Sequence, residues 1–281
     1  MKIIECPRDA MQGIKDFIPT QEKTRYINAL LKVGFDTLDF GSFVSPKAIP
    51  QLSDSKSVLS GLHLASSTSL LAIVANLRGA IDALGLEEIS YLGFPLSLSE
   101  TFQQRNTKKS IDQAFIEIKD IQEKVLQKNR TLVVYLSMGF GNPYGDPYQE
   151  AYIHEFVHKL ATLDISIISL ADTIGIAQPA EIHKQLQALI TTFPDIEIGA
   201  HLHVTPNSAK PKIKAMLDAG CSRIDGAIGG YGGCPMATDV LTGNLNTLDI
   251  IKHLNDDDLT VDIEALENAR QLSQEIFTKY F

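Results

Sequence analysis

Short apolar runs alternate with longer amphipathic segments along almost the entire chain. The apolar runs have the length of buried strands, and they lie at residues 2–6, 36–40, 70–74, 89–93, 131–137, 165–170, 196–200 and 223–226. Segments with helical periodicity lie between them, at 20–33, 111–128, 148–160, 179–192 and 208–219, and a final helix is expected at 263–280. Strands that alternate with helices in this way predict a parallel sheet covered by helices.

The number of strand–helix units favours a closed barrel over an open sheet. Eight units in 281 residues fit a (β/α)8 TIM barrel, which typically has about 250 residues. A dinucleotide-binding fold would carry a Gly-x-Gly-x-x-Gly motif after the first strand, and segment 6–12, Cys-Pro-Arg-Asp-Ala-Met-Gln, has none. We therefore expect one α/β domain over residues 1–281, a TIM barrel with an extra C-terminal helix. That helix either packs across the barrel or forms the interface of a homodimer.

Composition and charge narrow the class of protein. Hydrophobic residues make up 44% and charged residues 21% of the chain, as in ordinary globular proteins. The net charge of −9, without a Lys/Arg block, argues against a nucleic-acid partner. Three cysteines without a Cys-x-x-Cys motif do not predict a disulfide scaffold or a zinc ribbon. No apolar run has membrane-spanning length, and the N-terminal run is too short for a signal peptide. We therefore expect a cytoplasmic enzyme or binding protein without a membrane partner.

Two histidines mark the end of the seventh apolar run. His201 and His203 are two residues apart, so both imidazoles lie on one face if the run is a strand. They could then bind one metal ion, or they could be polar residues at a strand end. Asp9, after the first strand, could add a carboxylate, because strands one and seven are near neighbours in a closed barrel, or it could cap a turn. Two imidazoles and one carboxylate with open positions suit a divalent Lewis acid.

Other polar residues follow strands at the end where barrel enzymes place their chemistry. The guanidinium of Arg8 could stabilise an enolate oxygen or form a salt bridge. Asp39 and Asp172 are each placed at a strand end, where they could act in catalysis or cap a helix. Cys234 lies among four glycines, and a loop thiol is well placed to exchange a proton. Asn244 could bind a metal through its amide oxygen or cap the next helix.

Four motifs together resemble those of the hydroxymethylglutaryl-CoA lyases. They are Phe-Val-Ser-Pro-Lys at 43–47, Asp-Thr-Ile-Gly at 172–175, His-Leu-His at 201–203 and Gly-Gly-Cys-Pro at 232–235. The resemblance runs in order from Arg8 to Asn244. It implies a metal-dependent TIM barrel that cleaves 3-hydroxy-3-methylglutaryl-CoA to acetoacetate and acetyl-CoA by a retro-Claisen reaction.

The resemblance also implies a role for each candidate. Mg²⁺ or Mn²⁺ would be bound by one carboxylate, two imidazoles and an amide, from Asp9, His201, His203 and Asn244. The catalytic residues would be Arg8 for the acetyl-CoA enolate, Cys234 for proton transfer, Asp39 in place of a catalytic glutamate, and Asp172 for proton transfer or positioning.

A CoA-binding loop is implied at 99–106. Its Ser-Glu-x-Phe-x-x-Arg-Asn pattern places Arg105 and Asn106 on the substrate side, and Lys108 and Lys109 follow. These cations would supply local positive charge for a CoA thioester in an otherwise acidic chain.

The chain departs from the family pattern around the substrate. Ala-Met replaces the usual Gly-Leu at 10–11, and Val-Thr-Pro-Asn stands at 204–207 in place of Asp-Thr-Tyr-Gly. Asp39 is one methylene shorter than the family's glutamate. Three alternatives therefore remain: a lyase for another 3-hydroxyacyl-CoA, a condensing synthase built on the same barrel, and a barrel that binds metal or CoA without catalysis.

Overall fold

Eight parallel strands form a closed barrel. The computed structural model describes residues 1–65, 67–233, 242–254 and 261–280. Each strand pairs with the next, and the eighth pairs with the first. The strands are β1 (Lys2–Glu5), β2 (Thr37–Ser42), β3 (Ser69–Ile73), β4 (Ile89–Ser97), β5 (Thr131–Ser137), β6 (Ile167–Asp172), β7 (Glu197–Val204) and β8 (Arg223–Gly226). The predicted TIM barrel is confirmed.

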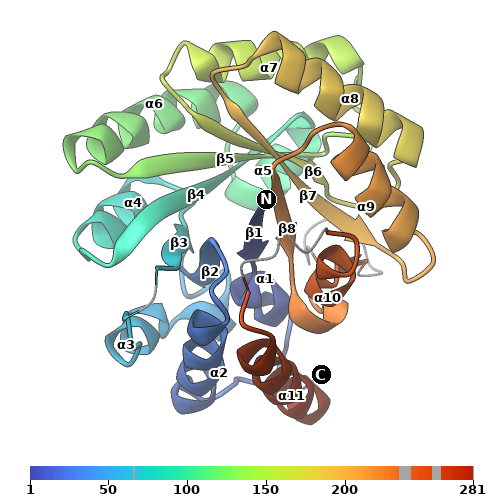
Figure 1. Ribbon diagram of the computed structural model, residues 1–281. Coiled ribbons are helices and arrows are strands. Elements are labelled where there is room, and N and C mark those ends of the chain that lie inside the picture. The colour runs from blue at the N-terminus through green and yellow to red at the C-terminus, as the bar shows by residue number, and fades with distance from the viewer. Residues whose placement is uncertain (66, 234–241, 255–260, 281) are drawn as a thin grey trace.

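A ring of helices surrounds the strands, which meet at the centre of Figure 1. The ring consists of α2 (Thr20–Val33), α3 (Ser55–Ser60), α4 (Leu77–Leu84), α6 (Ile111–Gln127), α7 (Glu150–Ala161), α8 (Pro179–Thr192), α9 (Ala209–Asp218) and α11 (Ile263–Tyr280). The extra C-terminal helix is therefore confirmed as α11. It packs beside α2 (Figure 1), where Tyr26 and Phe277 meet edge to face with ring centroids 6.3 Å apart.

Several short elements were not predicted. They are α3 and α4 of the ring, α1 (Pro7–Gln12), α5 (Glu100–Thr107), α10 (Thr247–Ile251), β9 (Gly243–Asn244) and the 3-10 turns η1 (Pro50–Leu52) and η2 (Ile228–Gly230). Two of them, α1 and α5, follow strands directly at the mouth of the barrel. They carry polar side chains rather than an apolar period, which is why the hydrophobic pattern does not reveal them.

Local sequence signals set the helix ends. Ser110 and Gln113 form a reciprocal capping box at the start of α6. Gly34, with φ 85°, ends α2 in the left-handed region that glycine adopts without strain. None of the helices in the described ranges combines the length and apolar character needed to cross a bilayer.

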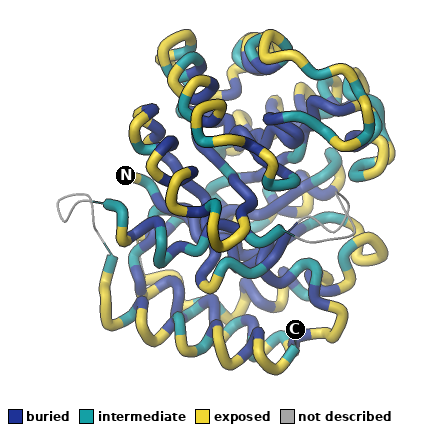
Figure 2. The backbone as a smooth tube through the Cα atoms, turned by 90° about the vertical axis from the view of Figure 1, so that its right-hand side faces the viewer, coloured by how far each residue is buried: buried dark blue, intermediate teal, exposed yellow. Residues whose placement is uncertain are grey.

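Apolar side chains form two layers. A small cluster fills the barrel interior and consists of Leu71, Ile73, Val133, Tyr135 and Ile167. The larger core lies between the barrel and the inner faces of the helices, so that buried strands lie beneath helices with exposed outer faces in Figure 2. Because strand residues alternate between these layers, one face of each strand points into the barrel and toward its mouth.

Glu5 is a carboxyl buried completely in this architecture. It accepts hydrogen bonds from the backbone N–H of Ile228 and the hydroxyl of Thr247. Burial raises the pKa of Glu5 from 4.5 to about 8, although both hydrogen bonds act in the opposite direction. The folded state therefore binds more protons than the unfolded state between these two pH values, and stability falls as pH rises through that window.

Glu5→Gln should remove this dependence. The unfolding free energy of the wild type should fall from pH 5 to pH 8.5 by at least about 1 kcal/mol more than that of the variant. Urea unfolding at both pH values measures the difference. Parallel stability curves for the two proteins would contradict a raised pKa at Glu5.

Candidate active site

Three potential metal ligands converge at the barrel mouth. Asp9, His201 and His203 each offer one ligand atom, and these atoms lie within 4.8 Å of one another. Asp9 lies in α1, which starts directly after β1 with Pro7 at its first turn. Its carboxylate does not cap a helix, because it accepts hydrogen bonds from Arg8, Gln12 and Asn244. We refer to Asp9, His201 and His203 as the upper ligand group.

The two histidines lie within β7, and not beyond its end. Ala171 and Asp172 of β6 pair with His201 and Leu202, so the ladder continues past the apolar run. The imidazole centroids are 5.1 Å apart at an interplanar angle of 77°. Their placement on one face of the strand, and facing one cavity, is as expected from the two-residue spacing.

The protonation states of His203 and Asp9 in the upper ligand group favour a bound cation. Burial, followed by the neighbouring His201, lowers the pKa of His203 to about 4, so its imidazole is neutral at physiological pH. The Nδ1 atom of His203 is buried without a hydrogen-bond partner in the described part of the chain. Burial opposes ionisation of Asp9, but Arg8 and the two histidines outweigh it and lower the pKa of Asp9 to about 2. A carboxylate beside a neutral imidazole whose Nδ1 has no partner is a donor set that fits a divalent ion.

Asn244 completes the surroundings of Asp9. It lies in β9, which pairs antiparallel with β7 so that Asn244 is opposite His203. Its amide nitrogen donates to Asp9 Oδ2 at 2.6 Å and to the carbonyl of Tyr231 at 2.9 Å. The capping alternative is wrong for this residue, because Asn246 caps α10.

Arg8 forms a buried ion-pair network with two carboxylates. Its Nε and Nη2 atoms donate to Asp39 Oδ2 at 2.9 and 2.6 Å, and Nη1 donates to Asp9 Oδ1 at 3.0 Å. Burial is the largest influence on Asp39 and raises its pKa to about 6 in spite of Arg8. Asp39 is therefore ionised at neutral pH. It lies inside β2, beside a register shift, because the strand continues two residues beyond the predicted end at Phe40.

All of these side chains except Asn244 face one cavity of about 300 Å³. Arg8, Asp9, Asp39 and both histidines form its polar base, and apolar walls come from side chains such as Ile49 and Phe102. A mostly apolar cavity with a few convergent charged groups is the usual form of a site for a small molecule.

Comparison with known proteins shows the family of this chain. The profile of the HMGL-like family matches residues 2–274. The chain belongs to the HMGL-like family. A hydroxymethylglutaryl-CoA lyase of Bacillus subtilis, YngG, is 34% identical over 273 residues, which cover 96% of this chain and 90% of the relative. The mitochondrial hydroxymethylglutaryl-CoA lyase of Mus musculus is 32% identical and covers 91% of this chain, which spans 78% of that protein.

Solved structures of HMGL-like lyases have the same fold. An HMG-CoA lyase from A. baumannii, in complex with coenzyme A and 3-methylmalate, superposes with a TM-score of 0.91 at 29% identity, covering 99% of this chain and 91% of that one. The B. subtilis HMG-CoA lyase has a TM-score of 0.89 at 33% identity, with 98% and 92% covered.

Asp172 does not join the other candidates at the cavity. Ala171 and Thr173 line the cavity, and alternate strand residues point to opposite faces. The carboxylate of Asp172 instead accepts the Lys212 ammonium at 2.6 Å and the backbone N–H groups of Ile176 and Ala177. It therefore anchors α9 and the loop after β6 from outside the barrel.

Lys212→Met should leave Asp172 buried without its cation. Both side chains are at most 2% exposed, so the variant should lose about 3–5 kcal/mol of unfolding free energy. The double variant Asp172→Asn/Lys212→Met should recover most of that loss, as judged by urea unfolding. Equal losses in the single and double variants would contradict a paired buried charge.

The segment implied to bind CoA is a helix and not a loop. Ser99 accepts a hydrogen bond from the Phe102 N–H and caps α5. Asn106 lines the cavity, whereas Arg105 stacks over Tyr144 at 5.1 Å from the ring centroid. Lys108 is exposed at the end of α5, with φ 61°.

Lys109 pairs with Glu117 of α6 and also donates to the carbonyl of Ala75 at 3.4 Å. Its ammonium is therefore already partnered. Of the four polar residues implied for CoA, Asn106 is the one that lines the cavity among the described residues.

The glycine loop approaches the ligand group, although Cys234 itself lies outside the described residues. Gly232, with φ 98°, packs so closely that a Cβ atom would lie 2.7 Å from Asn244 Nδ2 and from the Asp9 carbonyl. Glycine is therefore required for the backbone to pass directly over these two residues.

Asp225 was not singled out from the sequence. Its Oδ2 atom lies 3.1 Å from His201 Nδ1, and it lines the cavity from β8. Burial opposes protonation of His201, but the hydrogen bond to Asp225 and its charge outweigh burial and raise the pKa of His201. The pattern Arg-Ile-Asp at 223–225 repeats the alternate polar spacing of the histidine pair, and that spacing could have identified it.

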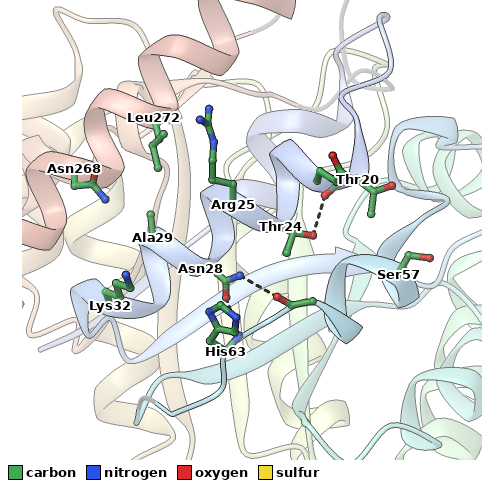
Figure 3. Close-up of a pocket in the computed structure, with 12 residues that line it drawn as sticks. Thr20, Thr24, Arg25, Asn28, Ala29, Lys32, Ser57, His63, Asn268 and Leu272 are labelled. Atoms are coloured by element: carbon green, nitrogen blue, oxygen red, sulfur yellow. Dashed lines mark hydrogen bonds between the residues drawn. The ribbon is translucent and has the colours of Figure 1, made fainter.

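A second cavity, of about 650 Å³, lies on the outside of the helix ring and is shown in Figure 3. It is lined by residues of α2, α3, α11 and the segment after α3, including Asn28, His63 and Leu272. Its described lining has one histidine and no carboxylate or thiol. We therefore place no chemistry there.

Proposed function

We propose that this protein cleaves 3-hydroxy-3-methylglutaryl-CoA into acetoacetate and acetyl-CoA with the help of Mg²⁺ or Mn²⁺. The observation that carries the proposal is the convergence of Asp9, His201 and His203 beside Arg8 in a single cavity. Relatives named hydroxymethylglutaryl-CoA lyases, at 34% and 32% identity, support the reaction. A coenzyme A complex of a similar structure supports a CoA thioester as the substrate class.

The upper ligand group and Asn244 would hold the metal. One carboxylate, two imidazoles and an amide oxygen would be a ligand set suited to a divalent ion such as Mn²⁺. When bound, the ion supplies Lewis acidity that lowers the pKa of a substrate hydroxyl and polarises a carbonyl.

Arg8 would stabilise the charge that develops when the carbon–carbon bond breaks. In that step the tertiary alkoxide becomes the ketone of acetoacetate, and the bond electrons pass to the enolate of acetyl-CoA. Arg8 is held rigidly by Asp39 and Asp9, so little reorganisation is needed to place a guanidinium N–H against the enolate oxygen.

Asp39 is the carboxylate available to accept the hydroxyl proton. It lines the cavity and its pKa of about 6 leaves it ionised at neutral pH. It also fixes Arg8, whose Nε and Nη2 atoms both donate to this carboxylate. Asp172 would act only as a positioning residue, because its carboxylate faces away from the cavity and pairs with Lys212.

Cys234 would return a proton to the enolate carbon, as the resemblance of the Gly-Gly-Cys-Pro motif implies. Cys234→Ser should therefore reduce kcat by about 10²–10⁴-fold and leave the Mn²⁺ affinity within about threefold, because the thiol is not assigned as a ligand. Steady-state assays and Mn²⁺ titration measure the two effects separately. A loss of Mn²⁺ affinity in this variant would contradict the assignment.

The CoA moiety would enter past α5. Asn106 lines the cavity, and we assign Arg105 and Lys108, on the more exposed side of the same segment, to the phosphate groups. A few local cations suffice for an anionic ligand in a chain of net charge −9.

A substrate panel tests this proposal against its alternatives. Purified protein with Mn²⁺ is incubated with 3-hydroxy-3-methylglutaryl-CoA, with other 3-hydroxyacyl-CoA thioesters, and with acetyl-CoA plus 2-oxo acids. We expect the highest kcat/KM for the first substrate. Exclusive cleavage of another thioester, or condensation with a 2-oxo acid, would overturn the proposed substrate.

A further inference from the structure

A second set of potential ligands lies next to the upper ligand group. Cys6, His201 and Asp225 offer one ligand atom each, and these atoms also lie within 4.8 Å of one another. We call these three residues the lower ligand group. The two groups share His201 and differ in that the lower one contains a thiol.

The lower ligand group is built from buried side chains on three neighbouring strands. Cys6 directly follows β1, His201 is in β7 and Asp225 is in β8. Strand β8 lies between β1 and β7 and pairs with each. Cys6 and Asp225 are 1% and 2% exposed, and His201 and Asp225 line the cavity, so an ion can reach the group from the barrel mouth.

Two of its groups have unused capacity for a ligand. The Oδ1 atom of Asp225 is buried and has no hydrogen-bond partner in the described part of the chain. The thiol of Cys6 makes a single weak contact, 3.6 Å from the carbonyl of Ile4. The His201 Nδ1 atom is already 3.1 Å from Asp225 Oδ2. Ligand atoms around a tetrahedral Zn²⁺ are roughly 3.3–3.8 Å apart for the usual bond lengths, so small side-chain rotations would close the group on an ion.

We propose that Cys6, His201 and Asp225 form a second cation site that selects thiophilic divalent ions such as Zn²⁺ and Co²⁺ over Mg²⁺ and Mn²⁺. A thiolate is a soft ligand that favours Zn²⁺, whereas carboxylate and water suit Mg²⁺ and Mn²⁺. Binding replaces the Cys6 S–H bond with a sulfur–metal bond and releases one proton to solvent. A water molecule or substrate oxygen occupies the fourth position.

Occupation of the lower group would empty the upper one, because His201 is shared. A neutral imidazole has one protonated nitrogen and one lone pair. With Nδ1–H directed to Asp225, the lone pair of Nε2 is available to the upper ligand group. Coordination through Nδ1 moves the proton to Nε2 and removes that ligand. Zn²⁺ bound at the lower ligand group therefore weakens Mn²⁺ binding at the upper ligand group without occupying it.

Titration of the metal-free, full-length protein with Co²⁺ tests the site directly. Thiolate coordination produces a sulfur-to-cobalt charge-transfer band in the near ultraviolet. We expect this band in the wild type, in Cys221→Ala and in Cys234→Ser, and we expect its loss in both Cys6→Ala and Cys6→Ser. Cys221 is the matched control, since it is also a buried thiol, at 2% exposure.

Competition between ions tests the shared histidine. Free Mn²⁺ is followed by electron paramagnetic resonance while Zn²⁺ is added to the Mn²⁺-loaded protein. The Zn²⁺ concentration that displaces half of the Mn²⁺ should rise at least tenfold in Cys6→Ala, whereas the Mn²⁺ affinity without Zn²⁺ should change less than threefold.

A charge-transfer band that persists in both Cys6 variants, or that disappears in Cys234→Ser, would overturn the proposal. So would an unchanged Zn²⁺ midpoint in Cys6→Ala. The inference uses the metal ligands of the proposed function, but neither readout requires turnover. A protein that shows both effects and cleaves no thioester would contradict the proposed function alone.

Discussion

His203→Ala should abolish divalent-metal binding and thioester cleavage together. The imidazole of His203 is buried, neutral at physiological pH and unpartnered at Nδ1, so a metal is the partner that its position suits. Its removal leaves one imidazole and one carboxylate in the upper ligand group. Outer hydrogen-bond partners of a ligand already contribute 10–100-fold to metal affinity. Loss of the ligand itself should therefore weaken Mn²⁺ binding by at least about 100-fold.

Electron paramagnetic resonance of free Mn²⁺ measures the affinity, and coupled detection of acetyl-CoA measures the activity. His158→Ala is the matched control, because His158 is exposed on α7. That variant should resemble the wild type in both assays. Full Mn²⁺ affinity in His203→Ala would remove His203 from the metal site.

Arg8→Met should lower kcat by about 10²–10³-fold, which is the usual effect of removing one donor to a developing oxyanion. The variant also removes the cation between Asp9 and Asp39. The pKa of Asp39, already about 6, should rise further, so the remaining activity should require a higher pH. The kcat of Arg8→Lys should fall between those of the wild type and Arg8→Met, because lysine keeps the charge but loses the bidentate contact with Asp39.

The role of Arg8 in stabilising the enolate can be measured separately from cleavage of the carbon–carbon bond. Exchange of the methyl protons of acetyl-CoA with D₂O, followed by NMR, should slow in Arg8→Met by a factor similar to that for kcat. Arg270→Met, which removes a surface pair with Glu267 on α11, serves as the control. An Arg8→Met protein that keeps more than a tenth of the wild-type rate would contradict the assignment.

The fold could be predicted because its determinants are periodic and local. Alternating strands and helices identify a TIM barrel, and α2, α8 and α11 have the predicted bounds. The histidine pair could be interpreted because a spacing of two places side chains on one face of any strand.

Other features depend on information that periodicity does not carry. The residues of β6 are buried on both faces, as in most parallel sheets, so the apolar run before Asp172 does not reveal which face it occupies. The pairing of Asp172 with Lys212, 40 residues away, turns this carboxylate away from the cavity. The predicted strand ended at Phe40, next to Asp39, because the last two residues of β2, Gly41 and Ser42, carry no apolar signal. The alternate polar spacing at 223–225 marks Asp225 as a residue of one strand face, but its pairing with His201 is known only from the 3.1 Å contact in the folded barrel.

The most direct test of the account is the metal dependence of product formation. The protein is freed of metal, incubated with 3-hydroxy-3-methylglutaryl-CoA, and then supplied with Mn²⁺ while acetoacetate and acetyl-CoA are quantified. We predict no product before the addition, and equal amounts of both products after it. A protein that binds Mn²⁺ tightly and forms neither product would contradict a lyase centred on Asp9, His201 and His203.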